Sequence, residues 1–334
     1  MFYSRSWHAA VTLFNGSILV CGGIANTDYR ASTELYDPVN RRWQSTRAMI
    51  HGRVQHILSI LPNGQILAVG GDADVNSGYE KADLYNPLTD TWMFTRSMQN
   101  ARSEHAASLL NNGQLFVTGG IYRNDYLNST ELYNSISNSW ETTGQLNYAR
   151  ASFTSSVLKD GNVLITGGRN NDGVLKSTEL YDPSTGKWSI IDDLEFARVD
   201  HTATVLENGK VLVVGGSSNG TFISLKSAEL YDPLTKRWFG TSNMSHPRCG
   251  HTASLLPNGK VLVTGGYLFV FSQIQVVNTV ELYNPRTETW DFVESFSVPR
   301  AHHTASVLLD GRVLIAGGLG QGGSLNSAEL YSPY

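Results

Sequence analysis

The chain has 334 residues, of which 41% are hydrophobic and 16% charged, and its formal net charge is −4. Together with 32 glycines, this composition is typical of a globular protein with many turns and excludes a disordered chain. The net charge provides no general basic field for a phosphate backbone, so nucleic acid is not an expected partner. Membrane insertion is not expected either, because the sequence contains no run of about 18 apolar residues.

The only two cysteines, Cys21 and Cys249, are too few for a disulfide framework, and we expect them to be free thiols. The first residues lack the charged and apolar segments of a signal peptide. The sequence does not determine the location of the protein. It is compatible with the cytoplasm or, if this chain is a fragment, with an extracellular location.

A unit of about 50 residues recurs seven times in the chain, so one repeat domain over residues 1–334 is predicted. The units span residues 5–52, 53–101, 102–149, 150–197, 198–247, 248–299 and 300–334. Each unit begins with an arginine, at Arg5, Arg53, Arg102, Arg150, Arg198, Arg248 and Arg300. A glycine pair starts 17 residues after each arginine, giving Gly22, Gly23, Gly70, Gly71, Gly119, Gly120, Gly167, Gly168, Gly215, Gly216, Gly265, Gly266, Gly317 and Gly318.

Two more elements follow in each unit. An acidic residue starts an acid-Leu-Tyr triplet, at Glu34, Asp83, Glu131, Glu179, Glu229, Glu281 and Glu329. In six units a tryptophan stands nine residues after this acid, at Trp43, Trp92, Trp140, Trp188, Trp238 and Trp290. The rigid spacing predicts the same local structure in every unit.

The unit that begins at Arg198 contains four short strand signals in chain order. These are a run over residues 201–206, an apolar run over 211–214 after an Asn-Gly turn, a third run over 228–231 and a last one around Trp238. Four antiparallel strands cannot bury both faces alone, so the units are expected to stack radially into an all-β, seven-bladed β-propeller. The glycine pairs, tyrosines and tryptophans would then be packing residues.

The double glycine followed by separated Tyr and Trp resembles the kelch repeat, and it covers nearly the whole chain. The resemblance implies a seven-bladed propeller of the galactose oxidase/kelch type. It implies less about function, because such propellers serve as binding modules, as substrate receptors and sometimes as enzymes.

The last unit is expected to lack its outer strand. Its tryptophan would stand nine residues after Glu329, beyond Tyr334, and only Met1 to Ser4 precede Arg5. We therefore predict six four-stranded blades and one three-stranded blade. Its exposed edge would either pair with another strand or indicate that this chain is a fragment of a longer array, and the second interpretation is slightly favoured.

Differences in unit length fall entirely in the loop between the second and third strands, where 11 to 15 residues separate the second glycine from the acid. Loops that vary on one face of a constant scaffold are typical recognition surfaces. The longest of them, residues 267–277, is unusually apolar, and Tyr267, Phe269 and Phe271 are its candidate binding residues. An equally weighted alternative is that part of this loop extends the two strands.

The seven arginines have two interpretations. They are candidate ligand residues near the channel mouth, because guanidinium groups suit bidentate contacts with acidic peptides. Alternatively, each arginine pairs with the acid of its own unit in a structural salt bridge, and this interpretation is favoured two to one.

A histidine follows the arginine by three positions in six units, at His8, His56, His105, His201, His251 and His303, with Phe153 in the remaining unit. Packing explains this row better than a metal does, since a ring spreads equivalent residues apart, and no metal or cofactor is expected. The residues considered for catalysis are His51, His246, Cys249 and His302, but they form no nucleophile-and-base pair in the sequence.

The predicted function is a non-catalytic binding scaffold for a protein or peptide, with an acidic partner one option. The alternatives are carbohydrate binding and, less favoured, an enzyme of the galactose oxidase type. Glycan binding would use the loop aromatics Tyr122, Tyr126, Phe222 and Phe269.

Overall fold

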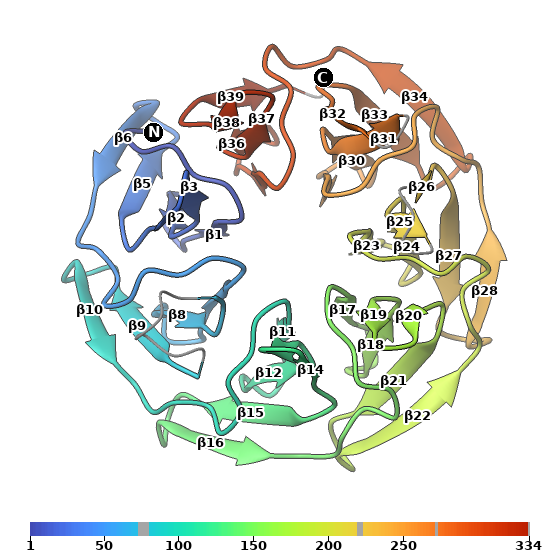
Figure 1. Cartoon of the computed structure of the whole chain (residues 1–334), viewed down its shortest axis with the longest axis horizontal. Coiled ribbons are helices and arrows are strands. Elements are labelled where there is room, and N and C mark those ends of the chain that lie inside the picture. The colour runs from blue at the N-terminus through green and yellow to red at the C-terminus, as the bar shows by residue number, and fades with distance from the viewer. Residues whose placement is uncertain (73–79, 219–222, 271–272, 333–334) are drawn as a thin grey trace.

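The protein is an all-β ring of seven blades, as the sequence predicts (Figure 1). A computed structural model describes residues 1–72, 80–218, 223–270 and 273–332. No helix in this part of the chain could cross a bilayer. Six blades are four-stranded antiparallel sheets and the seventh is three-stranded.

Within each blade the strands follow one another from the channel outward. The innermost strands are β1 (Ala9–Thr12), β7 (Ile57–Ile60), β11 (Ala106–Leu109), β17 (Thr154–Val157), β23 (Thr202–Val205), β29 (Thr252–Leu255) and β35 (Thr304–Val307). The second strands are β2 (Ile18–Cys21), β8 (Ile66–Val69), β12 (Leu115–Thr118), β18 (Val163–Thr166), β24 (Val211–Val214), β30 (Val261–Thr264) and β36 (Val313–Ala316). The third strands are β5 (Thr33–Asp37), β9 (Ala82–Asn86), β15 (Thr130–Asn134), β21 (Thr178–Asp182), β27 (Ala228–Asp232), β33 (Val280–Asn284) and β39 (Ala328–Tyr331).

The outer strands complete blades 1 to 6. They are β6 (Arg42–Ser45), β10 (Thr91–Phe94), β16 (Ser139–Thr142), β22 (Lys187–Ile191), β28 (Arg237–Gly240) and β34 (Thr289–Val293). Each begins after a tight turn from the third strand, and its tryptophan lies opposite the tyrosine of that strand, as in the pair Tyr181 and Trp188.

The second strands form the core of the ring, and all four residues of each one are buried. Because side chains of a strand alternate between its two faces, each second strand packs against both neighbouring blades. Leu19 and Cys21 contact Ile66 and Tyr85 of blade 2, whereas Ile18 and Val20 contact blade 7. The core is therefore seven apolar layers between blades.

The glycine pairs sit where neighbouring blades approach most closely. Gly22 and Gly23 have φ angles of 66° and 89°, a region that side chains with a Cβ rarely adopt. A Cβ on Gly22 would lie 2.6 Å from the carbonyl oxygen of Arg53 and 2.6 Å from the ring of His56. A side chain at this position would force two blades apart.

Short hairpins fill most of the loops between second and third strands. These hairpins are β3 (Ile24–Ala25) with β4 (Asp28–Tyr29), β13 (Ile121–Tyr122) with β14 (Asp125–Tyr126), β19 (Arg169–Asn170) with β20 (Gly173–Val174), β25 (Ser217–Ser218) with β26 (Ile223–Ser224), β31 (Tyr267–Val270) with β32 (Gln273–Val276), and β37 (Leu319–Gly320) with β38 (Gly323–Ser324). They form two-stranded sheets separate from the blades. The long loop of unit 6 thus folds as its own hairpin, β31–β32.

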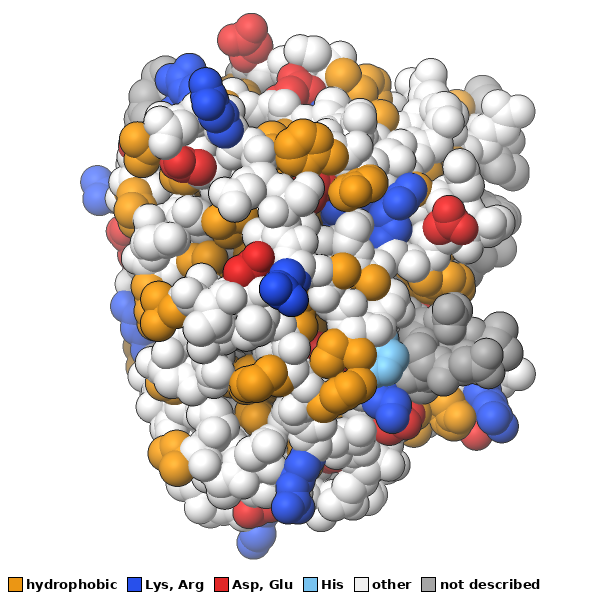
Figure 2. Space-filling view, turned by 90° about the vertical axis from the view of Figure 1, so that its left-hand side faces the viewer, with side chains coloured by type: hydrophobic (Ala, Val, Ile, Leu, Met, Phe, Trp, Pro, Cys, Tyr) orange, Lys and Arg blue, Asp and Glu red, His pale blue; other side chains and the backbone are white. Residues whose placement is uncertain are grey.

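The seventh blade has only β35, β36 and β39, which confirms the predicted missing strand. Tyr331 of β39 is half-buried, whereas the corresponding tyrosines of the other six blades are 0 to 4% exposed. The side of the ring seen in Figure 2 carries apolar, acidic and basic side chains interspersed, without a large field of one charge.

Candidate functional site at the channel mouth

The seven arginines lie inside the blades, not at the channel surface. Arg150 donates from Nη1 to the carbonyl oxygens of Gly167 at 2.8 Å and Ser177 at 2.9 Å, and from Nη2 to Glu179 at 2.9 Å. The Glu179 carboxylate also accepts backbone N–H groups from Asn147 and Tyr148. Both buried charges are thus paired and hydrogen-bonded, which is the condition under which burial of an ion pair is tolerated.

The other six units repeat this arrangement. Every arginine side chain of the row is at most 2% exposed, and each guanidinium lies 2.5 to 2.9 Å from the acid of its own unit. These are the contacts expected if each arginine pairs with the acid of its own unit, and not those of a ligand-binding row at the channel mouth. The arginine–acid pairs therefore hold the second strand, the third strand and the connection from the preceding blade together.

The histidine row lines the inner wall as a buried, neutral layer. Burial lowers the pKa of His8, His105 and His201 to about 3. His201 Nε2 lies 3.1 Å from the Thr154 hydroxyl of the preceding blade and 3.0 Å from that of Thr166. His201 therefore links neighbouring blades, and His8, His251 and His303 make the same kind of contact with a threonine of the preceding blade.

The residue between each arginine and histidine, two positions after the arginine, forms a ring at the channel mouth. We call it the mouth ring; it consists of Trp7, Gln55, Glu104, Ser152, Asp200, Gly250 and His302. All seven have φ between 48° and 60°, and six of them are not glycine. Non-glycine residues in this region are uncommon and, when clustered, point to a functional constraint.

Backbone hydrogen bonds connect the mouth ring from blade to blade. The amide of Trp7 donates to the His302 carbonyl at 3.1 Å, and that of Gln55 donates to the Trp7 carbonyl at 3.0 Å. Equivalent bonds join Ser152 to Glu104 and His302 to Gly250. These inter-blade bonds join backbone atoms in the left-handed conformation and involve no side chain. The residue type at each ring position can therefore differ.

A second ring lies directly above it and is formed by the residue after each glycine pair. It comprises Ile24, Asp72, Ile121, Arg169, Ser217, Tyr267 and Leu319. Each pairs as an isolated β-bridge with the residue before a mouth-ring position, as Tyr267 does with Cys249. The hairpins are thereby fixed over the channel.

One wall of the mouth is aromatic. The rings of Trp7 and His302 are stacked, with centroids 4.5 Å apart, and Tyr267 lies 5.4 Å from His302. Phe269 meets Tyr267 edge-to-face at 5.5 Å. Burial lowers the pKa of His302 to about 4, so this wall carries no positive charge at neutral pH.

The facing wall is polar and net acidic. Arg169 binds both carboxylate oxygens of Glu104, at 2.8 and 3.0 Å, and the Ser152 hydroxyl donates to the same carboxylate. Asp200 is close enough for the charges of both Glu104 and Arg169 to act on it, and it has the Tyr267 hydroxyl 3.4 Å away. Burial and then the charge of Glu104 raise the pKa of Asp200.

These two walls enclose a cavity of about 390 Å³, which continues into the histidine-lined channel through a second space of about 290 Å³. The cavity is of the size that small ligands or single side chains occupy. It collects six different side chains from one repeat position, and it is our candidate binding site.

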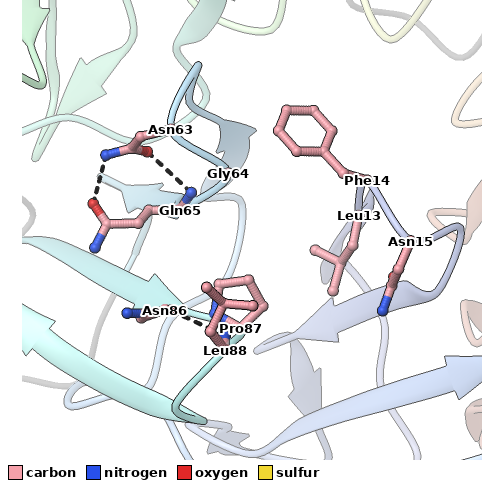
Figure 3. A pocket seen from close by; sticks show the side chains of 9 residues that line it. All are labelled: Leu13, Phe14, Asn15, Asn63, Gly64, Gln65, Asn86, Pro87 and Leu88. Carbon is pink, nitrogen blue, oxygen red and sulfur yellow. Dashed lines mark hydrogen bonds between the residues drawn. The ribbon is translucent and has the colours of Figure 1, made fainter.

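A larger cavity, of about 510 Å³, lies on the opposite face between the turns of blades 1 and 2 (Figure 3). Phe14 and Leu88 border it and are 73% and 93% exposed. The same turn positions of blades 5 and 6 enclose an equivalent space of about 210 Å³. This hollow therefore follows from the repeat geometry of neighbouring turns.

The other residues singled out in the sequence are dispersed. Tyr267 and Phe269 lie at the mouth, whereas Phe271 and Phe222 are outside the described residues. Cys21 and Cys249 are free and buried, and burial raises the pKa of the Cys249 thiol to about 12. His51 and His246 lie beside the acids Asp83 and Glu281 of the following blades, away from His302. No nucleophile-and-base pair is assembled from these residues in the described structure.

The mouth ring itself was missed as a set, although the Arg-x-x-His element contains it. The sequence signal was the second x, which differs in all seven units while the arginine before it recurs in every unit and the histidine after it in six. Only the positive φ angles and the backbone ring show that these positions converge.

The chain belongs to the kelch-repeat family. The family described as "KLHDC2/KLHL20/DRC7 Kelch-repeats domain" matches residues 7–216 and 61–266, and the Kelch motif matches residues 247–297. No curated protein matches the sequence. Among solved structures, the chain is similar to a fungal alcohol oxidase of the AA5 family in complex with copper, with 20% identity and a TM-score of 0.82. That alignment covers 99% of this chain and 75% of the oxidase, and at this identity it shows the fold alone.

The residues of the mouth do not fit a copper site. Within the described residues, no three His, Cys, Asp or Glu side chains are placed to hold a metal ion together. Tyr267 is the tyrosine nearest to His302, and burial and then the charge of Asp200 raise its pKa. A raised pKa opposes the tyrosinate form that would ligate a metal. We therefore derive no redox step for this chain.

Proposed function

We propose that this chain is a non-catalytic binding propeller that recognises a peptide segment of a protein partner at its channel mouth. The observation that carries the proposal is the mouth ring, where equivalent backbone positions of six blades present six different side chains around one open cavity. Kelch propellers typically bind proteins, and loops on a rigid scaffold are the usual place for recognition.

The chemistry of the mouth favours a ligand with a basic side chain. Glu104 and Asp200 contribute two carboxylates to one arginine, and Arg169 is hydrogen-bonded to Glu104. Trp7 and Tyr267 border the same cavity, and aromatic faces attract cations. A lysine or arginine of the partner would thus meet Asp200 on one side and aromatic rings on the other.

An acidic motif held by the arginine row has less support, because the guanidinium groups are engaged within the blades. Sugar binding also has less support. Tyr267 and Phe269 meet at an interplanar angle of 88°, so they do not form one flat platform with Trp7.

Selection of displayed random peptides on the immobilised chain tests this proposal. We expect enrichment of peptides with Lys or Arg, and at least a tenfold loss of their affinity for Asp200→Asn and Trp7→Ser, which is about 1.4 kcal/mol. Glu207→Gln, on the opposite face, is the matched control and should bind normally. If selected peptides bind all three variants equally, the channel mouth is not the recognition site.

A further inference from the structure

The channel mouth gathers four aromatic side chains around the cavity that also contains its carboxylates. Trp7, Tyr267, Phe269 and His302 all border the space of about 390 Å³. The rings of Trp7 and His302 are inclined by only 23°, whereas those of Tyr267 and Phe269 are almost perpendicular, at 88°. The four rings therefore do not share one plane, and such a wall suits a compact, rounded group better than a flat one.

Contacts within the protein hold the hairpin that carries two of these rings. Tyr267 and Cys249 exchange two backbone hydrogen bonds, each of 2.9 Å, and the Cys249 thiol also donates to the Tyr267 carbonyl. The Phe269 amide donates to the hydroxyl of Ser224, in the hairpin of the preceding blade, at 3.2 Å. A site that is already ordered loses little conformational freedom when a ligand binds.

Gly250 of the mouth ring provides the space in which two of the rings meet. The other six ring positions have φ between 48° and 55° and are not glycine, so the φ of 60° at Gly250 does not by itself require one. A Cβ on Gly250, however, would lie 2.8 Å from the ring of Tyr267 and 2.8 Å from that of His302. Any other residue at this position would therefore displace both rings.

The charges of the cavity favour a cation. The carboxylates of Glu104 and Asp200 and one guanidinium, that of Arg169, border it. Burial lowers the pKa of His302 to about 4, so this ring is neutral at pH 7 and does not repel a cation. A single positive charge would thus meet both negative charge and aromatic faces, which attract cations.

The hydrogen bonds of the cavity distinguish between kinds of cation. Arg169 and the Ser152 hydroxyl already donate to the Glu104 carboxylate, and the Tyr267 hydroxyl donates to Asp200. A primary ammonium has three N–H donors, and each of them needs an acceptor when water is removed. A trimethylated ammonium carries the same charge without any N–H, and its methyl groups can pack against the rings.

We infer that the mouth is an aromatic cage for the methylated ammonium of a modified lysine, formed by Trp7, Tyr267, Phe269 and His302 with the charge of Asp200 beside it. The inference rests on the peptide-binding function proposed above, and it specifies the form of the basic residue that the site takes. Aromatic faces that surround a quaternary ammonium supply electrostatic attraction and apolar contact together.

The test compares three capped peptides in calorimetric titrations of the whole chain. The first is Gly-Gly-Lys-Gly-Gly with a trimethylated lysine, the second has an unmodified lysine, and in the third a carbon replaces the quaternary nitrogen. The second peptide lacks the methyl groups and the third lacks only the charge. We expect saturable binding of the trimethyllysine peptide, at least about tenfold tighter than that of either other peptide.

Variants connect this preference to the cage. Gly250→Ser should weaken binding of the trimethyllysine peptide at least about tenfold with little change in melting temperature, because Ser152 has the same backbone conformation. Tyr267→Leu should weaken it clearly more than Tyr267→Phe, which keeps the aromatic ring. Glu207→Gln, on the opposite face, is the control that should bind normally.

The outcomes separate this inference from the function on which it rests. If the unmodified lysine peptide binds as tightly as the trimethylated one, the cage is refuted while recognition of basic peptides at the mouth stands. Equal binding of the neutral peptide, or no saturable binding of the trimethyllysine peptide at millimolar concentration, would also refute the cage. Choline tests the source of the ammonium: if it binds as tightly as the trimethyllysine peptide, the ligand is a free small molecule and a modified lysine is refuted.

Discussion

Two neighbouring positions of each repeat behave in opposite ways. The arginine is identical in all seven units, is buried and makes the same contacts everywhere, as with Arg150 and Glu179. Two residues later, the mouth ring has seven different residues on one repeated backbone conformation. The repeated arginines belong to a structural framework, in which every unit needs the same contacts. The mouth ring is a recognition surface, which needs a particular group at each place.

Acidification should give the largest effect, because the framework contains the buried histidines. The pKa of His8, His105 and His201 is about 3 in the folded chain and near 6.5 when unfolded. The unfolded state therefore binds more protons between these values, and stability falls as the pH drops below about 6.5. Each histidine contributes about 1.4 kcal/mol per pH unit, or roughly 4 kcal/mol for the three. Urea unfolding at pH 7, 6 and 5 measures this slope; a flat profile would show that these groups titrate normally.

Removal of one framework charge comes next. Arg150→Ala leaves Glu179 buried without its cation, and we expect a loss of about 3 to 5 kcal/mol in unfolding free energy. Arg300→Ala is the matched control, because Glu329 is 23% exposed and water can solvate it. We expect a clearly smaller loss there. Equal losses in the two variants would contradict the role of burial.

Loss of an inter-blade aromatic should cost less. Trp188 is half-buried, its ring lies tilted against that of Tyr181 with centroids 5.1 Å apart, and its indole N–H donates to the Gly144 carbonyl. Because part of its ring faces solvent, Trp188→Ala should cost about 2 to 3 kcal/mol, below the 3 to 5 of a fully buried ring. Urea unfolding measures this. A loss under 1 kcal/mol would mean that the outer aromatics do not hold the blades together.

The smallest effect is expected within the histidine row. Neither ring nitrogen of His105 has a partner in the described structure, and Phe153 occupies the same repeat position. His105→Phe should therefore leave stability at pH 7 unchanged or raise it by up to about 1 kcal/mol, and reduce the acid sensitivity. His201→Phe loses two threonine contacts and should cost about 1 to 2 kcal/mol. Thermal unfolding distinguishes the two; the reverse order would refute this assignment.

Repetition explains what the sequence could predict. The constant spacing of arginine, glycine pair, acid and tryptophan was sufficient for the blade count, the strand order and the open seventh blade. The arginine–acid pairing was also foreseen as one of two interpretations, because equal numbers recur at fixed spacing. Each of these features depends on contacts within one unit or between neighbours.

The mouth could not be predicted in the same way, because it depends on closure of the ring. Trp7 and His302 are 295 residues apart in sequence and stack only because blades 1 and 7 meet. Asp200 and Tyr267 likewise come from different blades. The half-burial of Trp188 also depends on ring geometry, since the outer edges of blades diverge. The sequence left two expectations for residues 267–277, a contact loop or an extension of the two blade strands. The structure shows a hairpin, β31–β32, that forms its own two-stranded sheet and does not extend the blade.

The central claim is that the mouth ring serves recognition and not folding. The most direct test measures urea unfolding of a chain in which five ring residues are replaced by serine, as in Ser152. The substitutions are Trp7→Ser, Gln55→Ser, Glu104→Ser, Asp200→Ser and His302→Ser. We predict that the unfolding free energy changes by less than about 2 kcal/mol, since the ring is joined by backbone bonds and partly exposed side chains contribute little. A loss as large as that of Arg150→Ala would contradict the account, because the mouth ring would then belong to the framework.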